Sequence, residues 1–248
     1  MTGGDPPDSS SAVDPADGAA APGGALEAFR LADSFLPVGT NSISYGLEQF
    51  VAADRVRDAD DVQALLATHL RQLVGPAELV ALRAAHAAAS AGDVDGVCAA
   101  DQRLEAVTLP AEFRASAAHA GNRLLDVQRR VRSDDAVAAY AARVDAGDSP
   151  GFHAVVLGAT TARAGVGERE ACLVCCHGYA TALLGAAQRL LSLGHTDAQR
   201  VLTRIQPVMR AAIADSADRS LSQITSFAPL VDVLAADHER ADRRLFVS

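Results

Sequence analysis

The chain has 248 residues, 49% of them hydrophobic, and its 31 acidic and 22 basic residues give a formal net charge of −9. Every basic residue is an arginine, which excludes a P-loop lysine and a Schiff-base lysine, and the acidic balance argues against nucleic-acid binding. The sequence shows no basic and apolar leader, no run of about 18 apolar residues and too few cysteines for a disulfide framework, so we expect a cytoplasmic domain without a membrane segment.

The first 24 residues are composed largely of Gly, Pro, Asp, Ser and Ala. Such a segment cannot bury enough apolar surface to offset the entropy lost on ordering. We therefore predict a disordered acidic arm over residues 1–24. Because no second linker follows, we predict a single domain over residues 25–248.

Residues 31–50 form a segment that is poorly suited to a helix, because Pro37 and Gly46 interrupt it. The segment nevertheless carries aromatic side chains, among them Phe35 and Tyr45. Apolar side chains in a turn-rich stretch predict a loop that packs on the body of the domain.

Helical patterns follow one another from about residue 58. Asp58 or Asp60 can cap a helix whose Val and Leu side chains form one stripe. We expect Gly75-Pro76 to end that helix and to open the next one, which runs to about Ser90. Further helices are predicted after the turn Ala91-Gly92-Asp93, after Pro110, and after Ser133-Asp134.

The second half of the chain continues this pattern. A long apolar stretch from His153 to Leu193 is interrupted near Gly165-Val166-Gly167, and Thr196 with Gln199 fits a capping box that opens the next helix. Strand signals are almost absent. We therefore predict an all-α fold, a single helical-bundle-like domain of about eight to ten helices.

Four residues that can bind metals lie together at Cys172, Cys175, Cys176 and His177. On a helix, Cys172 lies beside the other two thiols, a spacing that could hold a soft metal or a redox pair. The haem pattern C-x-x-C-H is not met, because Cys176 stands where histidine is required. Free cysteine is also a common core residue. We favour core packing and keep a small helical metal or redox protein as the alternative function.

The sequence closes on HERADRRLFVS, in which apolar side chains follow several arginines. Leu245 and Phe246 would each forgo roughly 1.5 to 3 kcal/mol if they stayed in water. We expect the segment to be covered, either on its own domain or in an interface, and we favour docking to partner proteins. Arg244 can form a forked pair with a carboxylate that fixes the direction of the segment.

Three segments in the first two thirds of the chain carry recurring patterns. The first reads L-x-D-S-x-(L/F)-P-x-G…S-x-G-L-E, the second E-x-R-x-A…G-x-R, and the third H-x-x-x-x-G…G. They are formed by Leu31, Asp33, Ser34, Leu36, Pro37, Gly39, Ser44, Gly46, Leu47 and Glu48, by Glu112, Arg114, Ala115, Gly121 and Arg123, and by His153, Gly158 and Gly165.

Two later segments complete the series. The stretch 192–199 follows a P-L-G-Q-x-x-G-Q pattern at Gly194 and Gln199, with Ser192 and His195 as departures. The last segment follows H-E-x…S-R-L-F-x-S at His238, Glu239, Arg244, Leu245 and Phe246. Taken in order over residues 26–248, the five segments resemble the UreF family of urease accessory proteins. Ile43 departs from the histidine that is usual in the first segment.

The resemblance implies an all-α scaffold that dimerises and is not an enzyme. Such proteins join a second accessory protein, UreD or UreH, and the GTPase UreG on apo-urease. They modulate the GTP-dependent step that delivers nickel, which is the cargo of the complex and not a permanent cofactor. The residues expected to bind partners or to carry the family pattern are Asp33, Ser34, Pro37, Gly39, Tyr45, Gly46, Glu48, Glu112, Arg114, Gly121, His153, Gly194, Gln199, His238, Glu239, Arg244, Leu245 and Phe246. For Glu112 and Arg114, a structural ion pair is an open alternative.

Overall fold

The structure, a computed structural model, describes residues 22–39 and 43–238, and no strand occurs among them. The predicted all-α fold class is confirmed. The first half contains α1 (Pro22–Ala32), α2 (Leu47–Ala52), α3 (Ala59–His69), the π-helix η2 (Leu70–Leu79), α4 (Val80–Ser90), α5 (Val94–Val107) and α6 (Ala111–Val131). The second half contains α7 (Asp135–Asp145), α8 (His153–Arg163), α9 (Glu168–Leu190), α10 (His195–Ala217), the short 3₁₀ helix η3 (Leu221–Gln223) and α11 (Pro229–His238).

The helices α3, η2 and α4 form one unbroken run. The prediction that Gly75-Pro76 ends a helix is therefore wrong. A proline has no N–H to donate, so a helix can pass it only if the carbonyls left over find other donors. Here a distant extended segment supplies them: the N–H of Phe227 donates to the carbonyl O of Gln72 (3.3 Å), and that of Thr225 to the carbonyl O of Pro76 (3.1 Å).

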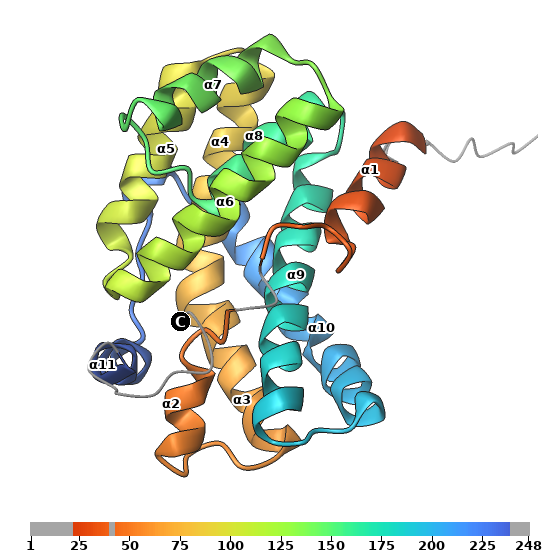
Figure 1. Cartoon of the computed structure of the whole chain (residues 1–248), viewed down its shortest axis with the longest axis vertical. Coiled ribbons are helices and arrows are strands. Elements are labelled where there is room, and N and C mark those ends of the chain that lie inside the picture. The colour runs from red at the N-terminus through yellow and green to blue at the C-terminus, as the bar shows by residue number, and fades with distance from the viewer. Residues whose placement is uncertain (1–21, 40–42, 239–248) are drawn as a thin grey trace, which may run out of the picture.

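The core is built around the pair α4 and α8, which lie side by side in the upper half of Figure 1. A Cβ on Gly158 of α8 would collide with the carbonyl O of Leu82 on α4, so this glycine permits the close approach of the two helices. Helices α5, α6 and α7 cover this pair, while α9 and α10 pack on α3 and η2 at the other end of the molecule.

The ends of several helices follow local sequence. Asp58, Asp93 and Asp134 accept hydrogen bonds from the first-turn N–H groups of α3, α5 and α7, and each of these helices begins where the sequence predicts a start. The prediction of a capping box at Thr196 is wrong. Helix α10 begins at His195, and its N-cap is Gly194, which offers no side-chain cap.

The N-terminal boundary can be compared with the predicted arm only in part. Helix α1 begins at Pro22, so residues 22–24 of that arm are helical, and residues 1–21 lie outside the described part.

One described helix, α9, is long and apolar enough in composition to cross a membrane. Within the protein, however, 67% of its most apolar window is buried. Packing against α1, α8 and α10 accounts for this composition, as expected for a core helix.

Candidate functional site

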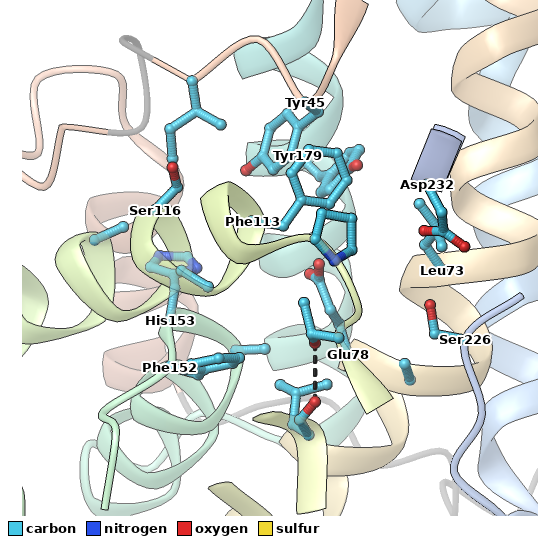
Figure 2. A pocket seen from close by; sticks show the side chains of 18 residues that line it. Tyr45, Leu73, Glu78, Phe113, Ser116, Phe152, His153, Tyr179, Ser226 and Asp232 are labelled. Atoms are coloured by element: carbon cyan, nitrogen blue, oxygen red, sulfur yellow. Dashed lines mark hydrogen bonds between the residues drawn. The ribbon is translucent and has the colours of Figure 1, made fainter. Parts of the chain in front are cut away.

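A pocket lies where the loop before α2, the π-helix η2, and helices α6, α8, α9 and α11 meet. In the view of Figure 2, Ser116 and His153 lie on one side, Ser226 and Asp232 lie on the other, and Glu78 lies between them. The apolar part of the lining includes Ile43, Leu73, Leu104, Phe113 and Phe152. Since these residues come from both halves of the chain, the pocket exists only in the folded protein.

Two tyrosines stack at the edge of this pocket. The ring centroids of Tyr45 and Tyr179 are 3.9 Å apart, with an angle of 26° between the ring planes. Behind them, Nδ1 of His69 lies 2.8 Å from the hydroxyl of Tyr179. Tyr45 has a φ of 50° and Gly46 one of 78°. A tyrosine in this left-handed region is strained, and such strain is found preferentially at functional sites.

Glu78, on η2, is one of two acidic side chains that line the pocket, the other being Asp232 on α11. The Glu78 side chain keeps some surface toward the open space of the pocket, but the surrounding protein desolvates the carboxyl and raises its pKa to about 7. Burial acts in the opposite sense on His69 and His153, since it lowers the pKa of each to about 4. Both imidazoles are therefore neutral near pH 7. The pocket thus holds an acidic group and no charged histidine.

His153 reaches the pocket because the backbone before it is held firmly. The carboxylate of Asp101, which is fully buried, accepts hydrogen bonds from the N–H groups of Gly151 (2.7 Å) and Phe152 (2.9 Å). On the other side, α6 approaches so closely that a Cβ on Gly121 would collide with the carbonyl O of Gly151. The family-pattern residues Gly121 and His153 are therefore adjacent in the fold.

A second pocket adjoins the first and shares Tyr45, Glu78, His153 and Tyr179 with it. Asp33 and Ser34, from the first patterned segment, line this second pocket. The first three patterned segments therefore converge on one region, although about 120 residues of sequence separate their ends.

Other predicted positions border the same region. A Cβ on Gly46 would lie 3.6 Å from the ring of Phe113, and one on Gly39 would lie 3.8 Å from the ring of His119. Pro37 is exposed in the loop between them and α1, and Glu48 is in the first turn of α2.

In the second patterned segment, Glu112 lies in the first turn of α6. The guanidinium of Arg114 donates from Nη1 to the carbonyl oxygens of Thr108 (2.9 Å) and Leu109 (2.5 Å). Arg114 thus fixes the connection between α5 and α6.

The remaining predicted positions are not brought to the pocket. Gly194 and Gln199 are exposed at the start of α10. His238 is the last residue of α11, and its side chain is outside the described part, as are Glu239, Arg244, Leu245 and Phe246. The prediction that Phe35 packs on the body is wrong, because 90% of its surface is exposed.

The cysteines of α9 are buried in the core, as the packing interpretation expects. Burial raises the pKa of the Cys172 thiol to about 11 and that of Cys176 to about 12, and it also raises the pKa of Cys175. The thiols are therefore protonated near neutral pH, when a metal ligand or nucleophile must be a thiolate. No group of three or more His, Cys, Asp or Glu side chains suited to a metal occurs among the described residues.

Sequence reasoning missed Glu78, His69, Tyr179 and Ser116 as residues of this region. The signal for Glu78 was an acidic residue two positions after Pro76 in an apolar stretch, which we read as a helix boundary. A π-helix in that place is itself typical of functional sites. The other three became recognisable only from their neighbours in space.

A protein-family model and several individual proteins that resemble this chain are all described as UreF. The model of the UreF family matches residues 56–206. The urease accessory protein UreF of Trichodesmium erythraeum is 31% identical over 223 residues, which are 90% of this chain and 96% of that protein. Urease accessory protein UreF 1 of Brucella melitensis is 30% identical over 225 residues, 91% of this chain and 93% of that protein. Urease accessory protein UreF of Yersinia enterocolitica is 30% identical over 223 residues, which are 89% of this chain and 96% of that protein.

Proposed function

The chain belongs to the UreF family of urease accessory proteins, and from this premise we propose that it acts as a scaffold in the assembly of the nickel centre of urease. It joins UreD or UreH and the GTPase UreG on apo-urease, and it modulates the GTP-dependent delivery of nickel. Nickel is the cargo of that complex and not a resident cofactor of this chain. The observation that carries the proposal is the similarity to accessory proteins over about nine tenths of the chain.

The surface of the described part supports a role in protein assembly. Large apolar side chains are exposed on and beside α1, at Leu26, Phe29 and Phe35, and a second group is exposed near α11, at Phe227 and Leu230. Exposed apolar patches are typical of interfaces. We propose that these two surfaces meet the partner proteins and the second copy of a homodimer, in the cytoplasm.

The patterned segments serve two different roles in this proposal. The residues around the pocket, such as Tyr45 and His153, shape the surface that partners meet. The final segment, which includes Arg244, Leu245 and Phe246, is proposed to dock on a partner within the assembled complex.

The alternative function, a metal or redox protein based on Cys172, Cys175 and Cys176, has less support. All three thiols are buried, and burial raises the pKa of each. A protein of that class would contain stoichiometric metal or show reversible thiol oxidation when purified, and these two measurements distinguish it from a scaffold.

Reconstitution tests the scaffold role directly. Apo-urease, UreD or UreH, UreG, GTP and nickel are combined with and without this chain, and urease activity is measured. We expect activation to require the chain, and the chain alone to hydrolyse no GTP, because it lacks a lysine and a phosphate-binding loop. GTP turnover that follows the purified protein, or full activation without it, would refute the proposal.

Interface variants sharpen this test. Phe35→Ser removes the most exposed aromatic side chain of the first apolar surface, and Val131→Ser serves as the matched control because Val131 is also exposed but lies outside every patterned segment. We expect Phe35→Ser to weaken co-purification with the partners while Val131→Ser does not. Equal effects of both variants would show that exposure alone, and not this surface, matters.

A further inference from the structure

Four side chains belong to two pockets at once. Tyr45, Glu78, His153 and Tyr179 line both the pocket of Figure 2 and the second pocket that adjoins it. They come from the loop before α2, from η2, from α8 and from α9. We call these four residues the shared wall, and a movement of any one of them changes the shape of both pockets.

Glu78 is the member of the shared wall whose negative charge has the least compensation. Among the described residues, its carboxylate accepts a single long hydrogen bond, from the Cys175 thiol, and no arginine lines either pocket. Burial raises the pKa of Glu78 to about 7. The carboxyl therefore gains or loses its proton near neutral pH, with only neutral donors beside it.

Among the described residues, no other ionisable group that faces Glu78 offers a positive charge near pH 7. The groups that line the two pockets from the elements around η2 are Asp33 after α1, Tyr45 before α2, His153 on α8, Cys175 and Tyr179 on α9, and Asp232 on α11. Burial lowers the pKa of His153 to about 4, and it raises the pKa of the thiol and of both phenols, so these four groups stay neutral. Burial also raises the pKa of Asp232. Ionised Glu78 therefore meets neutral or acidic neighbours from every element.

Tyr45 is the member of the shared wall that is held least firmly. Its ring stacks on Tyr179, with 3.9 Å between the centroids, but it lies outside the helices and its φ of 50° is in the left-handed region, which is costly for a tyrosine. Tyr179, by contrast, is on α9, and its hydroxyl lies 2.8 Å from Nδ1 of His69. Movement of Tyr45 out of the stack would relieve backbone strain, whereas movement of Tyr179 would break a buried hydrogen bond.

The charge of Glu78 and the position of Tyr45 are connected through solvation. A protonated carboxyl is neutral and can stay among apolar and aromatic neighbours, but a carboxylate needs hydrogen-bond donors or water. The face of an aromatic ring carries partial negative charge, so it does not solvate an anion. Loss of the proton from Glu78 therefore favours a rearrangement that brings water to the carboxylate, and Tyr45 is the side chain that can yield.

We propose that Glu78 and Tyr45 form a proton-dependent switch in the free protein. With Glu78 protonated, Tyr45 stacks on Tyr179, as in the structure. With Glu78 ionised, Tyr45 leaves the stack and water solvates the carboxylate. The step is the transfer of one proton from the Glu78 carboxyl to solvent, without a covalent change elsewhere. The proposal concerns the chain alone and does not depend on its role in urease maturation.

The aromatic content of the chain makes this switch measurable. The chain has three tyrosines, Tyr45, Tyr140 and Tyr179, and no tryptophan, so near-ultraviolet circular dichroism above the phenylalanine bands reports on tyrosine packing. The full-length protein is titrated across the Glu78 pKa of about 7, and we expect a one-proton change in this signal with its midpoint there. The far-ultraviolet signal, which measures helix content, should stay constant.

Three variants assign the change. Glu78→Gln imitates the protonated carboxyl, so it should abolish the change and keep the low-pH spectrum of the wild type. Asp232→Asn is the matched control, because it neutralises the acid that lines the pocket of Figure 2 together with Glu78. The change should persist there, with its midpoint at a lower pH, since a neighbouring negative charge is gone. Tyr140→Phe alters the tyrosine that pairs with Asp101, outside the shared wall, and should also leave the change in place.

Amide hydrogen exchange, compared between two proteins at one pH, shows whether Tyr45 itself moves. The N–H groups of Leu47 and Gln49 donate to the carbonyls of Ser44 and Gly46, which flank Tyr45, at 3.0 Å each. One pH unit above the pKa of Glu78, about nine tenths of the carboxyls are ionised, so these amides should exchange at least about tenfold faster in the wild type than in Glu78→Gln. Well below that pKa the two proteins should exchange alike.

Three outcomes would overturn the proposal. The first is a wild-type tyrosine spectrum that stays constant across this pH range, and the second is a change that survives Glu78→Gln. The third is equal exchange of the two amides in both proteins, which would mean that Glu78 titrates without moving Tyr45. If Glu78→Gln does not fold, Glu78→Asp replaces it, and an unchanged midpoint in that variant would equally overturn the proposal. A failure of urease activation in the reconstitution has no bearing on these measurements, since they use the purified chain alone.

Discussion

Two carboxylates, one fully buried at Asp101 and one partly buried at Glu78, place two regions of this protein in contrast. Asp101 accepts four hydrogen bonds, from the hydroxyls of Tyr140 and Ser149 and from the N–H groups of Gly151 and Phe152, at 2.6 to 2.9 Å. Among the described residues, Glu78 accepts a single hydrogen bond, a long one from the Cys175 thiol, with 4.0 Å between Sγ and Oε2.

The neighbours of the two carboxylates differ in the same way. In the part of the chain that the structure describes, the buried side-chain atoms without a hydrogen-bond partner include Nε2 of His69 and the hydroxyl of Ser116, which lie in the Glu78 region, and also one atom each of Gln63 and Gln128. The Asp101 region uses its polar groups to fix a loop. In the Glu78 region, the described residues leave some polar groups without a protein partner, whereas at Asp101 the buried polar groups are paired and stabilise the fold.

The largest expected effect is in the Asp101 region. Asp101→Ala leaves four buried donors without an acceptor, and we expect the free energy of unfolding to fall by about 4 kcal/mol, measured by urea denaturation. Asp95→Ala is the matched control on the same helix, because the exposed Asp95 side chain forms a surface ion pair with the partly exposed Arg143, and the substitution should cost less than about 1 kcal/mol. Similar losses for the two variants would contradict the view that Asp101 anchors this corner.

The second effect depends on pH and belongs to the Glu78 region. The pKa of His69 is about 4 in the folded protein and 6.5 when exposed. Below pH 6.5 the unfolded chain therefore binds the proton more readily. The contribution of His69 to the free energy of unfolding is fully present above pH 6.5. Up to about 3 kcal/mol of it is lost as the pH falls toward 4.

Removing the imidazole should remove the share of this pH dependence that belongs to His69. We expect His69→Gln to make the fall in unfolding free energy between pH 6.5 and 4 smaller by up to about 3 kcal/mol, measured by urea denaturation at several pH values, while His153, whose pKa burial also lowers to about 4, maintains a fall of its own. His195→Gln, which changes an exposed histidine on α10, should leave the slope unchanged. A slope that is the same in wild type and His69→Gln would show that His69 is not held neutral.

The third effect is smaller and concerns the buried thiols of α9, one of which, Cys175, lines the pocket that adjoins the first. Replacing Cys172, Cys175 and Cys176 together with alanine should cost on the order of 1 to 3 kcal/mol, because three small core side chains lose their packing. Urease activation should remain wherever the fold survives. Loss of activation in a variant that melts like the wild type would instead favour the metal or redox function.

The smallest effect compares the same substitution in the two regions. Ser149→Ala removes a hydroxyl that donates to Asp101 and should cost about 1 to 2 kcal/mol. Ser116→Ala removes a buried hydroxyl that has no hydrogen-bond partner among the described residues, so the melting temperature should stay the same or rise slightly, by the equivalent of at most about 1 kcal/mol. A loss for Ser116→Ala as large as that for Ser149→Ala would mean that Ser116 has an unseen partner.

Much of the fold was predictable because it depends on neighbours in sequence. Asp58 and Asp134 cap their helices with their own side chains, and helical periodicity identified the buried faces of most elements. Pro76 could not be interpreted correctly, since the donors that let the helix pass it lie in a distant segment. Phe35 was misjudged for a related reason, because aromatic character does not reveal whether a loop turns its side chain inward.

The site was predictable in the residues that carry the family pattern and not in those that complete it. Tyr45, Gly121 and His153 were singled out from sequence, and the fold brings all three to one region. Glu78 and Tyr179 stand in apolar helical stretches with no local pattern around them. Only tertiary packing places them beside the patterned residues and changes the pKa of Glu78.

The hydrogen bonds that join η2 to the segment before α11 also constrain the order in which parts of the structure can form during synthesis. The ribosome delivers the carbonyls of Gln72 and Pro76 about 150 residues before their donors at Phe227 and Thr225. Until then the long helix stays incomplete at its middle, and water must serve those carbonyls in place of protein. The wall of the pocket that carries Glu78 is therefore among the last parts of the molecule to mature, and a nascent chain halted before residue 225 would lack it.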